Sequence, residues 1–164
     1  MPQRLVALAC LLGLAAGCAL FRGPGTLLVQ ANAAFDRRDA EGAYALAKQI
    51  RLAYPASPES REAFPIAAYA WKFLYHQHRY SAPDSAWVTA EPAFLFDWLA
   101  TFFASGSPQQ AAEVMFVGLP YGVLRDFEDF ARSRPELAPW RLEAQDDNGI
   151  IQGVAVERAE ARAP

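Results

Sequence analysis

The stretch from Thr26 to Tyr54, TLLVQANAAFDRRDAEGAYALAKQIRLAY, carries the clearest structural signal in the chain. Its apolar residues recur every three or four positions in two runs, which is the spacing of amphipathic α-helices. The runs are Leu27, Leu28, Ala31, Ala34 and Phe35, then Ala43, Leu46, Ala47, Ile50, Ala53 and Tyr54. Only a few polar residues around Asp39 separate them, so we expect an antiparallel helix pair. Thr26 is a candidate N-cap for the first helix, and Pro55 ends the second.

The composition restricts the class of protein. The chain has 164 residues, of which 53% are hydrophobic and 20% charged, as expected for one globular domain and not for a disordered chain. Fifteen basic and 18 acidic residues give a net charge of -3. This charge provides no basic surface for nucleic acid, so we expect no nucleic-acid partner.

The N-terminus has the pattern of a secretory signal peptide over residues 1–17. One basic residue, Arg4, precedes an apolar run from Leu5 to Leu14, and small residues follow. The run is too short to span a hydrocarbon core comfortably, since that needs about 20 apolar residues. The next residues, Leu14-Ala15-Ala16-Gly17-Cys18, resemble the lipobox of bacterial lipoproteins. The alternative is cleavage after Ala19 by the ordinary signal peptidase, with Cys18 as a small apolar residue.

The lipobox resemblance implies that Cys18 is acylated and becomes the mature N-terminus, which makes the membrane a partner through a lipid anchor. Ala19 stands where an inner-membrane retention signal would have Asp. The resemblance therefore implies an outer-membrane protein facing the periplasm, if the host is Gram-negative. Residues 18–25 would form a short tether of at most about 25 Å. We expect a single folded domain over residues 26–158 and a flexible tail over residues 159–164.

The helix pair carries a second resemblance. Ala31 and Ala43 are twelve positions apart, and Pro55 follows twelve positions later. This spacing of small residues and a closing proline resembles a tetratricopeptide helical hairpin. Gln30 departs from the large apolar residue usual before the first small one, and no clean second copy follows. Since one repeat cannot bury its own apolar face, the rest of the chain is expected to cover it.

Prolines and glycines divide the rest of the chain into further segments. We expect helices from Ser60 to about Tyr80, from Pro92 to Gly106, from Ser107-Pro108 to Gly118 and from Tyr121 to Arg132, with a loop at Ser81–Glu91. The expected fold is mainly α, a tetratricopeptide-like antiparallel helical bundle with a small C-terminal β-hairpin.

The hairpin is expected at about residues 140–157, where apolar and polar residues alternate on both sides of Asn148-Gly149. A two-residue turn would place Trp140 opposite Glu157. A three-residue loop would pair Trp140 with Val156, and Leu142 with Val154, which puts the apolar residues on one face. We therefore expect the three-residue loop.

Candidate catalytic residues are few. The sequence contains no phosphate-binding glycine loop, no nucleophile elbow and no cysteine-based metal spacing, so we expect no cofactor and favour a non-enzymatic role. His76 and His78, with Asp84 nearby, are the best candidate metal ligands. Residues two apart on a helix point about 200° apart, so the two histidines could share a metal only in an extended segment.

One carboxylate needs a partner. Asp97 lies among apolar aromatic residues, and burying an unpaired charge there would be costly. Arg125 and Lys72 are the expected candidates for an ion pair with Asp97.

Aromatic residues are more numerous than a small helical core requires. We expect some of them to line a concave surface that binds a protein or ligand, while the alternative is that they fill the core. The candidates are Tyr44, Tyr69, Trp71, Tyr75, Trp87 and Trp98.

The favoured function is that of a periplasm-facing membrane lipoprotein acting as a protein-interaction or envelope-scaffolding module with a protein partner. Two alternatives remain open. The first is an envelope hydrolase or metal-binding enzyme that uses His76 and His78, which predicts that the two lie together in a cleft. The second is a periplasmic small-ligand carrier, which predicts an enclosed aromatic pocket.

Overall fold

A computed structural model describes residues 22–158, which are mainly helical and end in a β-hairpin, as the sequence predicts. The predicted signal peptide, Cys18 and the tail at residues 159–164 lie outside the described residues. The elements are α2 (Pro24–Asp36), α3 (Ala40–Ala53), α4 (Pro58–His78), α5 (Ala86–Thr89), α6 (Glu91–Ala104), α7 (Gln109–Phe116), α8 (Tyr121–Arg132), the 3-10 helix η1 (Pro135–Leu137), β1 (Trp140–Asp147) and β2 (Ile150–Arg158).

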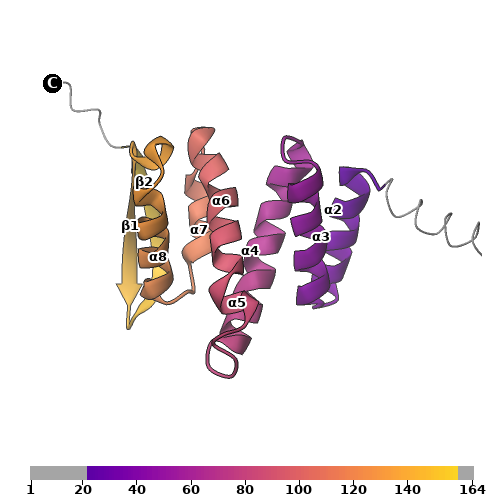
Figure 1. The fold of residues 1–164 in the computed structure, drawn as a ribbon, viewed down its shortest axis with the longest axis horizontal. Coiled ribbons are helices and arrows are strands. Elements are labelled where there is room, and N and C mark those ends of the chain that lie inside the picture. Colours follow the sequence, from indigo (N-terminus) through magenta and orange to yellow (C-terminus); the bar gives the residue numbers. More distant parts are fainter. Residues whose placement is uncertain (1–21, 159–164) are drawn as a thin grey trace, which may run out of the picture.

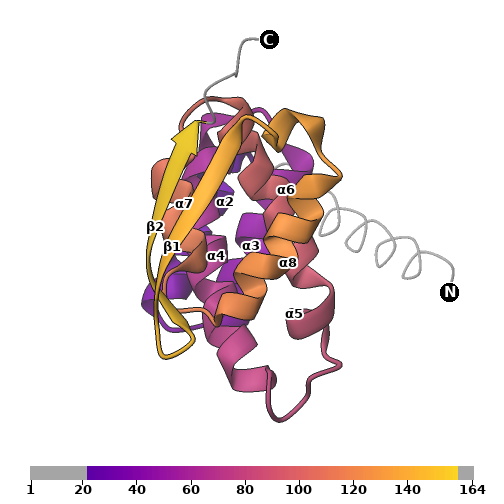
Figure 2. The same ribbon diagram turned by 90° about the vertical axis from the view of Figure 1, so that its left-hand side faces the viewer.

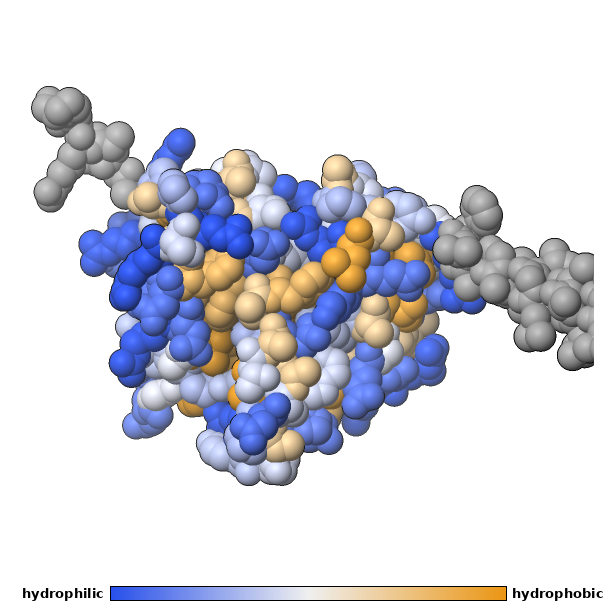
Figure 3. All heavy atoms as spheres, in the orientation of Figure 1, coloured by the Kyte–Doolittle hydropathy of each residue, from blue (hydrophilic) through white to orange (hydrophobic). Residues whose placement is uncertain are grey.

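The helices follow one another along the long axis of the domain, from α2 at one end to the hairpin at the other (Figure 1). Viewed from the hairpin end, α2, α4 and α7 lie on one side, and α6 and α8 lie on the other (Figure 2). In Figure 3 apolar residues reach the surface across the middle of one face, around the position of α6, with hydrophilic residues beside them. The arrangement leaves α4 in the centre, in contact with both halves of the domain.

The first helix pair forms where the sequence predicts it. Asp39 is the N-cap of α3, and its carboxylate accepts a hydrogen bond from the Gly42 N–H at 2.9 Å. The prediction that Thr26 caps α2 is wrong, because α2 begins at Pro24 with Gly23 as N-cap. Proline has no N–H to satisfy in the first turn and a φ suited to it, so the helix starts earlier.

Small residues form the contact between the first helices. The side chains of Ala31, Ala34, Ala43 and Ala47 are buried, so the backbones of α2 and α3 can approach closely. Aromatic residues fill the core of the other half instead. Phe127 of α8 lies within 5.3–6.0 Å, ring centre to ring centre, of Phe96, Phe103, Phe116 and Phe130.

Two connections differ from the sequence prediction. Residues 81–91 are not simply a loop, because they contain the short helix α5, where the Trp87 carbonyl accepts a hydrogen bond from Trp71 Nε1 at 2.8 Å. Ser107 does not cap α7, which begins at Gln109 with Pro108 as N-cap and no side-chain cap bond. The chain turns at Gly106 in the left-handed region (φ 79°) instead.

The predicted three-residue hairpin loop is wrong. Asp147 pairs with Ile150, so the turn contains only Asn148 and Gly149, both with positive φ (53° and 83°), as in a type I′ turn. The pairing then steps from Asp146–Ile151 to Gln145–Gly153, which leaves one extra residue in β2 as a bulge. This bulge brings Leu142 opposite Val156. A bulge therefore aligns the apolar face that the longer loop was expected to align.

Candidate functional site

Three of the six aromatic residues predicted to line a binding surface belong to the hydrophobic core. Tyr44, Trp71 and Trp98 are almost completely buried, so the prediction that they line a binding surface is wrong. Trp98 packs edge-on against Phe64, while the Tyr44 ring packs edge-on against Trp87.

Three other predicted aromatic residues keep some exposure. Trp87 and Tyr75 are half-buried, and Tyr69 is exposed. Burial raises the pKa of the Tyr75 hydroxyl, with Arg79 opposing the rise and Asp126 adding to it. Of the predicted set, only Tyr69 is exposed.

Tyr69 belongs to what we call the aromatic patch, made of Phe35, Tyr69 and Phe73. Their exposed fractions are 40%, 47% and 63%, and the Phe35 and Tyr69 ring centres are 6.4 Å apart. They line a depression of about 700 Å³ between the end of α2, the start of α3 and the middle of α4. Its other lining residues are Asp36, Arg38, Ala40 and Ala70.

Two members of the aromatic patch, Phe35 and Phe73, are not among the residues predicted to line a binding surface. Phe35 continues the apolar run of α2 and was assigned to the buried face, but it lies in the last turn, where the helix is ending. Phe73 is four residues from Tyr69 on α4, so both rings lie on the same helix face. That spacing was the signal that could have identified Phe73.

Lys72 lies next to the aromatic patch and is half-buried. Its Nζ donates a hydrogen bond to the Val117 carbonyl at 3.0 Å and lies 4.6 Å from the centre of the Tyr69 ring. Burial lowers the pKa of the Lys72 ammonium to about 8. The residue therefore connects the patch to the loop after α7 and does not pair with Asp97.

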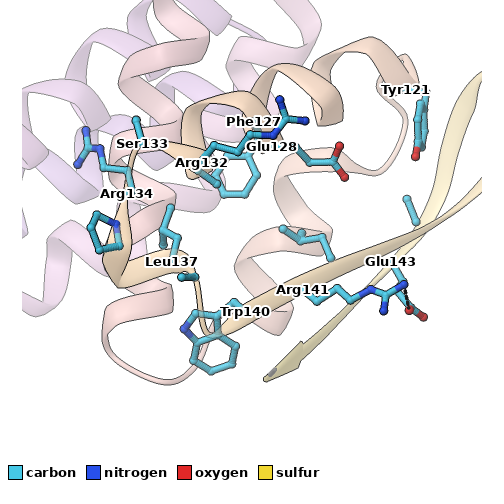
Figure 4. A pocket seen from close by; sticks show the side chains of 15 residues that line it. Tyr121, Phe127, Glu128, Arg132, Ser133, Arg134, Leu137, Trp140, Arg141 and Glu143 are labelled. Atoms are coloured by element: carbon cyan, nitrogen blue, oxygen red, sulfur yellow. Dashed lines mark ion pairs between the residues drawn. The ribbon is translucent and has the colours of Figure 1, made fainter. Parts of the chain in front are cut away.

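A second concavity, which we call the α8/β1 groove, has a volume of about 950 Å³. Figure 4 shows α8 and η1 forming one wall and β1 the other, with Tyr121 at one end and Trp140 near η1. The walls from α8 and its C-terminal extension contribute Tyr121, Phe127, Glu128, Ala131, Arg132, Ser133, Arg134, Pro135, Leu137 and Ala138, and β1 contributes Trp140, Arg141, Leu142, Glu143 and Ala144.

Charged residues of both signs line the α8/β1 groove. Arg141 and Glu143 form an ion pair at 3.2 Å on β1. Arg134 reaches out of the groove to Asp97 at 2.7 Å, so the expected pairing of Asp97 with Arg125 or Lys72 is wrong. Asp97 is more exposed than its aromatic neighbours suggested, because it lies on the outer side of α6.

The candidate metal ligands are not brought together as a site. His76 and His78 both lie on α4, so they are helical and not extended, and His76 Nε2 is 3.0 Å from the Gly118 carbonyl. Asp84 is exposed in the connection before α5. Among residues 22–158, no three His, Cys, Asp or Glu side chains are placed to hold a metal ion.

A polar cluster joins α3 to the start of α6. The Tyr44 hydroxyl donates to the Glu91 carboxylate, and Lys48 Nζ is 2.7 Å from the same group. Burial and the bond to Glu91 raise the pKa of the Tyr44 hydroxyl far above its usual value, so it stays protonated. These three groups satisfy one another, and the cluster therefore has a structural explanation.

Comparisons with known proteins add no family to these observations. Within residues 22–158, none of the helices combines the length and apolar character needed to cross a membrane. No protein-family model, no curated protein and no solved structure matches the chain.

Proposed function

We propose that this chain is a bacterial lipoprotein, anchored in the outer membrane through Cys18, whose helical domain binds a partner protein in the cell envelope. The lipobox-like sequence before Cys18 supports the anchor. The role of the domain is that of an interaction or scaffolding module.

The aromatic patch is the observation that supports this role. Contiguous exposed apolar surface is energetically unfavourable in water, and aromatic residues are enriched where proteins bind one another. The patch is concave and is bordered by charged residues, as many protein-binding surfaces are. Its rings lie on α2 and α4, which pack against each other and against α3, so a partner would meet a preformed surface.

The position of the patch suits a membrane-anchored protein. Pro24 begins α2 six residues after Cys18, whereas Phe35 lies in the last turn of the same helix. A helix of this length rises roughly 20 Å. The patch would therefore lie at the end of α2 that points away from the anchor, where a partner can reach it.

Site-specific photocrosslinking in native membranes tests the proposed function. A photoreactive phenylalanine analogue replaces Phe73 in the full-length chain, and the control replaces Leu52, an equally exposed apolar residue (66%) on α3. We expect the analogue at position 73 to crosslink one defined envelope protein, and the analogue at position 52 not to. Equal crosslinking of the same protein from both positions, or none from either, would contradict the role of the patch.

The anchor has its own test. We expect Cys18→Ala to move the protein from the membrane fraction to the soluble periplasmic fraction, because the acylated thiol is lost. Ala19→Ser is the matched control and should leave the protein in the membrane. A Cys18→Ala chain that stays membrane-bound would show that another segment holds it.

A further inference from the structure

We propose that the α8/β1 groove binds an extended segment of a partner protein, which adds to the free edge of β1 as a third strand. This site is separate from the aromatic patch and does not depend on its function. The argument rests on the sheet edge, the shape of the groove and its charge.

The edge of β1 is open. The sheet has two strands, and in an antiparallel pair every second residue directs its N–H and C=O away from the partner strand. Within residues 22–158, no backbone hydrogen bond joins Trp140–Gln145 to anything but β2. By contrast, at the start of β2 the Ile151 N–H donates to the Leu119 carbonyl, and the Ile151 carbonyl accepts from the Gly118 N–H. The regular stretch of β1 therefore offers unused backbone donors and acceptors.

The groove runs along this open edge. Five consecutive residues of β1, Trp140 to Ala144, line it, and α8 forms the facing wall (Figure 4). A strand edge beside a helix is the arrangement in which extended peptides bind by strand addition. The main chain of such a segment would pair with β1, while alternate side chains would meet the half-buried Tyr121 and Ala131 of α8 in the groove.

The charged side chains of the groove also limit which peptide sequences can bind there. The lining contains three arginines and two glutamates; Arg141 pairs with Glu143, and Arg134 pairs with Asp97 outside the groove. Arg132 is the most exposed of the arginines, and its salt bridge with Asp129 is a surface contact that a ligand can replace. We therefore infer a segment with apolar residues at alternate positions and an acidic residue near the Arg132 end.

The protein's own chain is a poorer occupant. Residues 159–164 include three alanines and one proline, which are depleted in strands. Arg158 pairs with Trp140 on the side of β1 away from the open edge, so a chain leaving Arg158 starts on the wrong side of β1. A second copy would present the edge of its own β1, but its α8 lies beside that edge and would have to occupy the space of β2.

Peptide selection on the full-length chain in detergent micelles tests the inference. The probe is a random library of peptides longer than the eight residues of β1, with counter-selection against Glu128→Trp, which places a large ring in the groove. The matched control is Glu113→Trp on the exposed side of α7. Circular dichroism verifies that both variants fold. We expect selected peptides to bind wild type and Glu113→Trp equally, and Glu128→Trp at least about tenfold more weakly.

Backbone methylation distinguishes strand addition from other binding in the same groove. The best peptide is synthesised with N-methyl groups on either of the two sets of alternate amides. One set would face β1, so its methylation should weaken binding by about tenfold or more, while methylation of the other set changes little. Equal binding of both methylated forms, or peptides that bind Glu128→Trp normally, would overturn the inference. So would a wild-type dimer that Glu128→Trp converts to monomer, since a second copy would then occupy the edge.

Discussion

The two halves of the domain are packed by opposite means. Helices α2 and α3 meet through alanines, with backbones close together, whereas α6, α7, α8 and the hairpin surround a cluster of phenylalanine rings. The first kind of contact requires small residues, and the second requires large ones. The two halves should therefore respond in opposite ways to a change in side-chain volume, and this difference can be measured.

The largest effect is expected from Phe127→Ala in the aromatic half. Phe127 contacts four other phenylalanine rings and is almost fully buried, so its removal leaves a cavity that rigid neighbours cannot fill. We expect the free energy of unfolding to fall by about 3–5 kcal/mol, measured by urea denaturation. Phe73→Ala, which truncates an exposed ring, is the control and should change it by less than about 0.5 kcal/mol. A similar loss for both variants would mean that the phenylalanine cluster has no special role.

The opposite substitution should affect the alanine half. Ala43→Leu adds volume where α3 meets its neighbours with no exposed surface, so the helices must separate. We expect a loss of about 1–3 kcal/mol in the free energy of unfolding. Ala45→Leu, two residues away and exposed on the same helix, should be close to neutral. If Ala43→Leu proves stabilising, the contact has unfilled space and the comparison between the halves fails.

The same difference explains which parts of the fold could be predicted from sequence. Small residues at helical spacing are a local signal, so the α2/α3 pair could be predicted, although α2 begins at Pro24 and not after Thr26. The bulge in β2 and the Arg134–Asp97 pair depend on elements brought together only by folding. Periodicity can identify the α8 helix and the hairpin, but it does not indicate that a groove lies between them.

The candidate sites show the same limit. Tyr69 could be identified as a surface residue, but Tyr44, Trp71 and Trp98 were equally good candidates on composition and are buried. The direction of a ring on a helix depends on which neighbours cover that helix. For α4, which contacts both halves, the sequence does not specify those neighbours.

A smaller effect is expected from Lys72, because it joins the two halves. Its ammonium group contacts Tyr69 in one half and the Val117 carbonyl in the other, and it keeps some access to water. The unfolded chain holds this proton up to about pH 10.5, whereas burial lowers the pKa in the folded protein to about 8. Between these values the unfolded state binds more protons, so the free energy of unfolding should rise with pH.

The measurement is urea denaturation at intervals from pH 8 to pH 10, compared with Lys72→Met, which keeps the stem but cannot titrate. Above pH 10 the raised pKa values of Tyr44 and Tyr75 act in the opposite direction, because the unfolded chain then loses tyrosine protons first. The rise should be present in the wild type and absent in the variant. Parallel pH profiles would show that another group is responsible.

The smallest effect is expected for the ion pair between Arg134 and Asp97 in the aromatic half. Both side chains are partly exposed, and Arg134 also lies 3.6 Å from Glu136, so water and a second carboxylate compensate for the loss of one partner. A double-mutant cycle with Asp97→Asn and Arg134→Gln should give a coupling free energy of at most about 1 kcal/mol, decreasing with added salt. A larger, salt-independent coupling would mean that the pair fixes the position of η1 against α6. The wall of the α8/β1 groove would then depend on a charge pair as well as on the phenylalanine cluster.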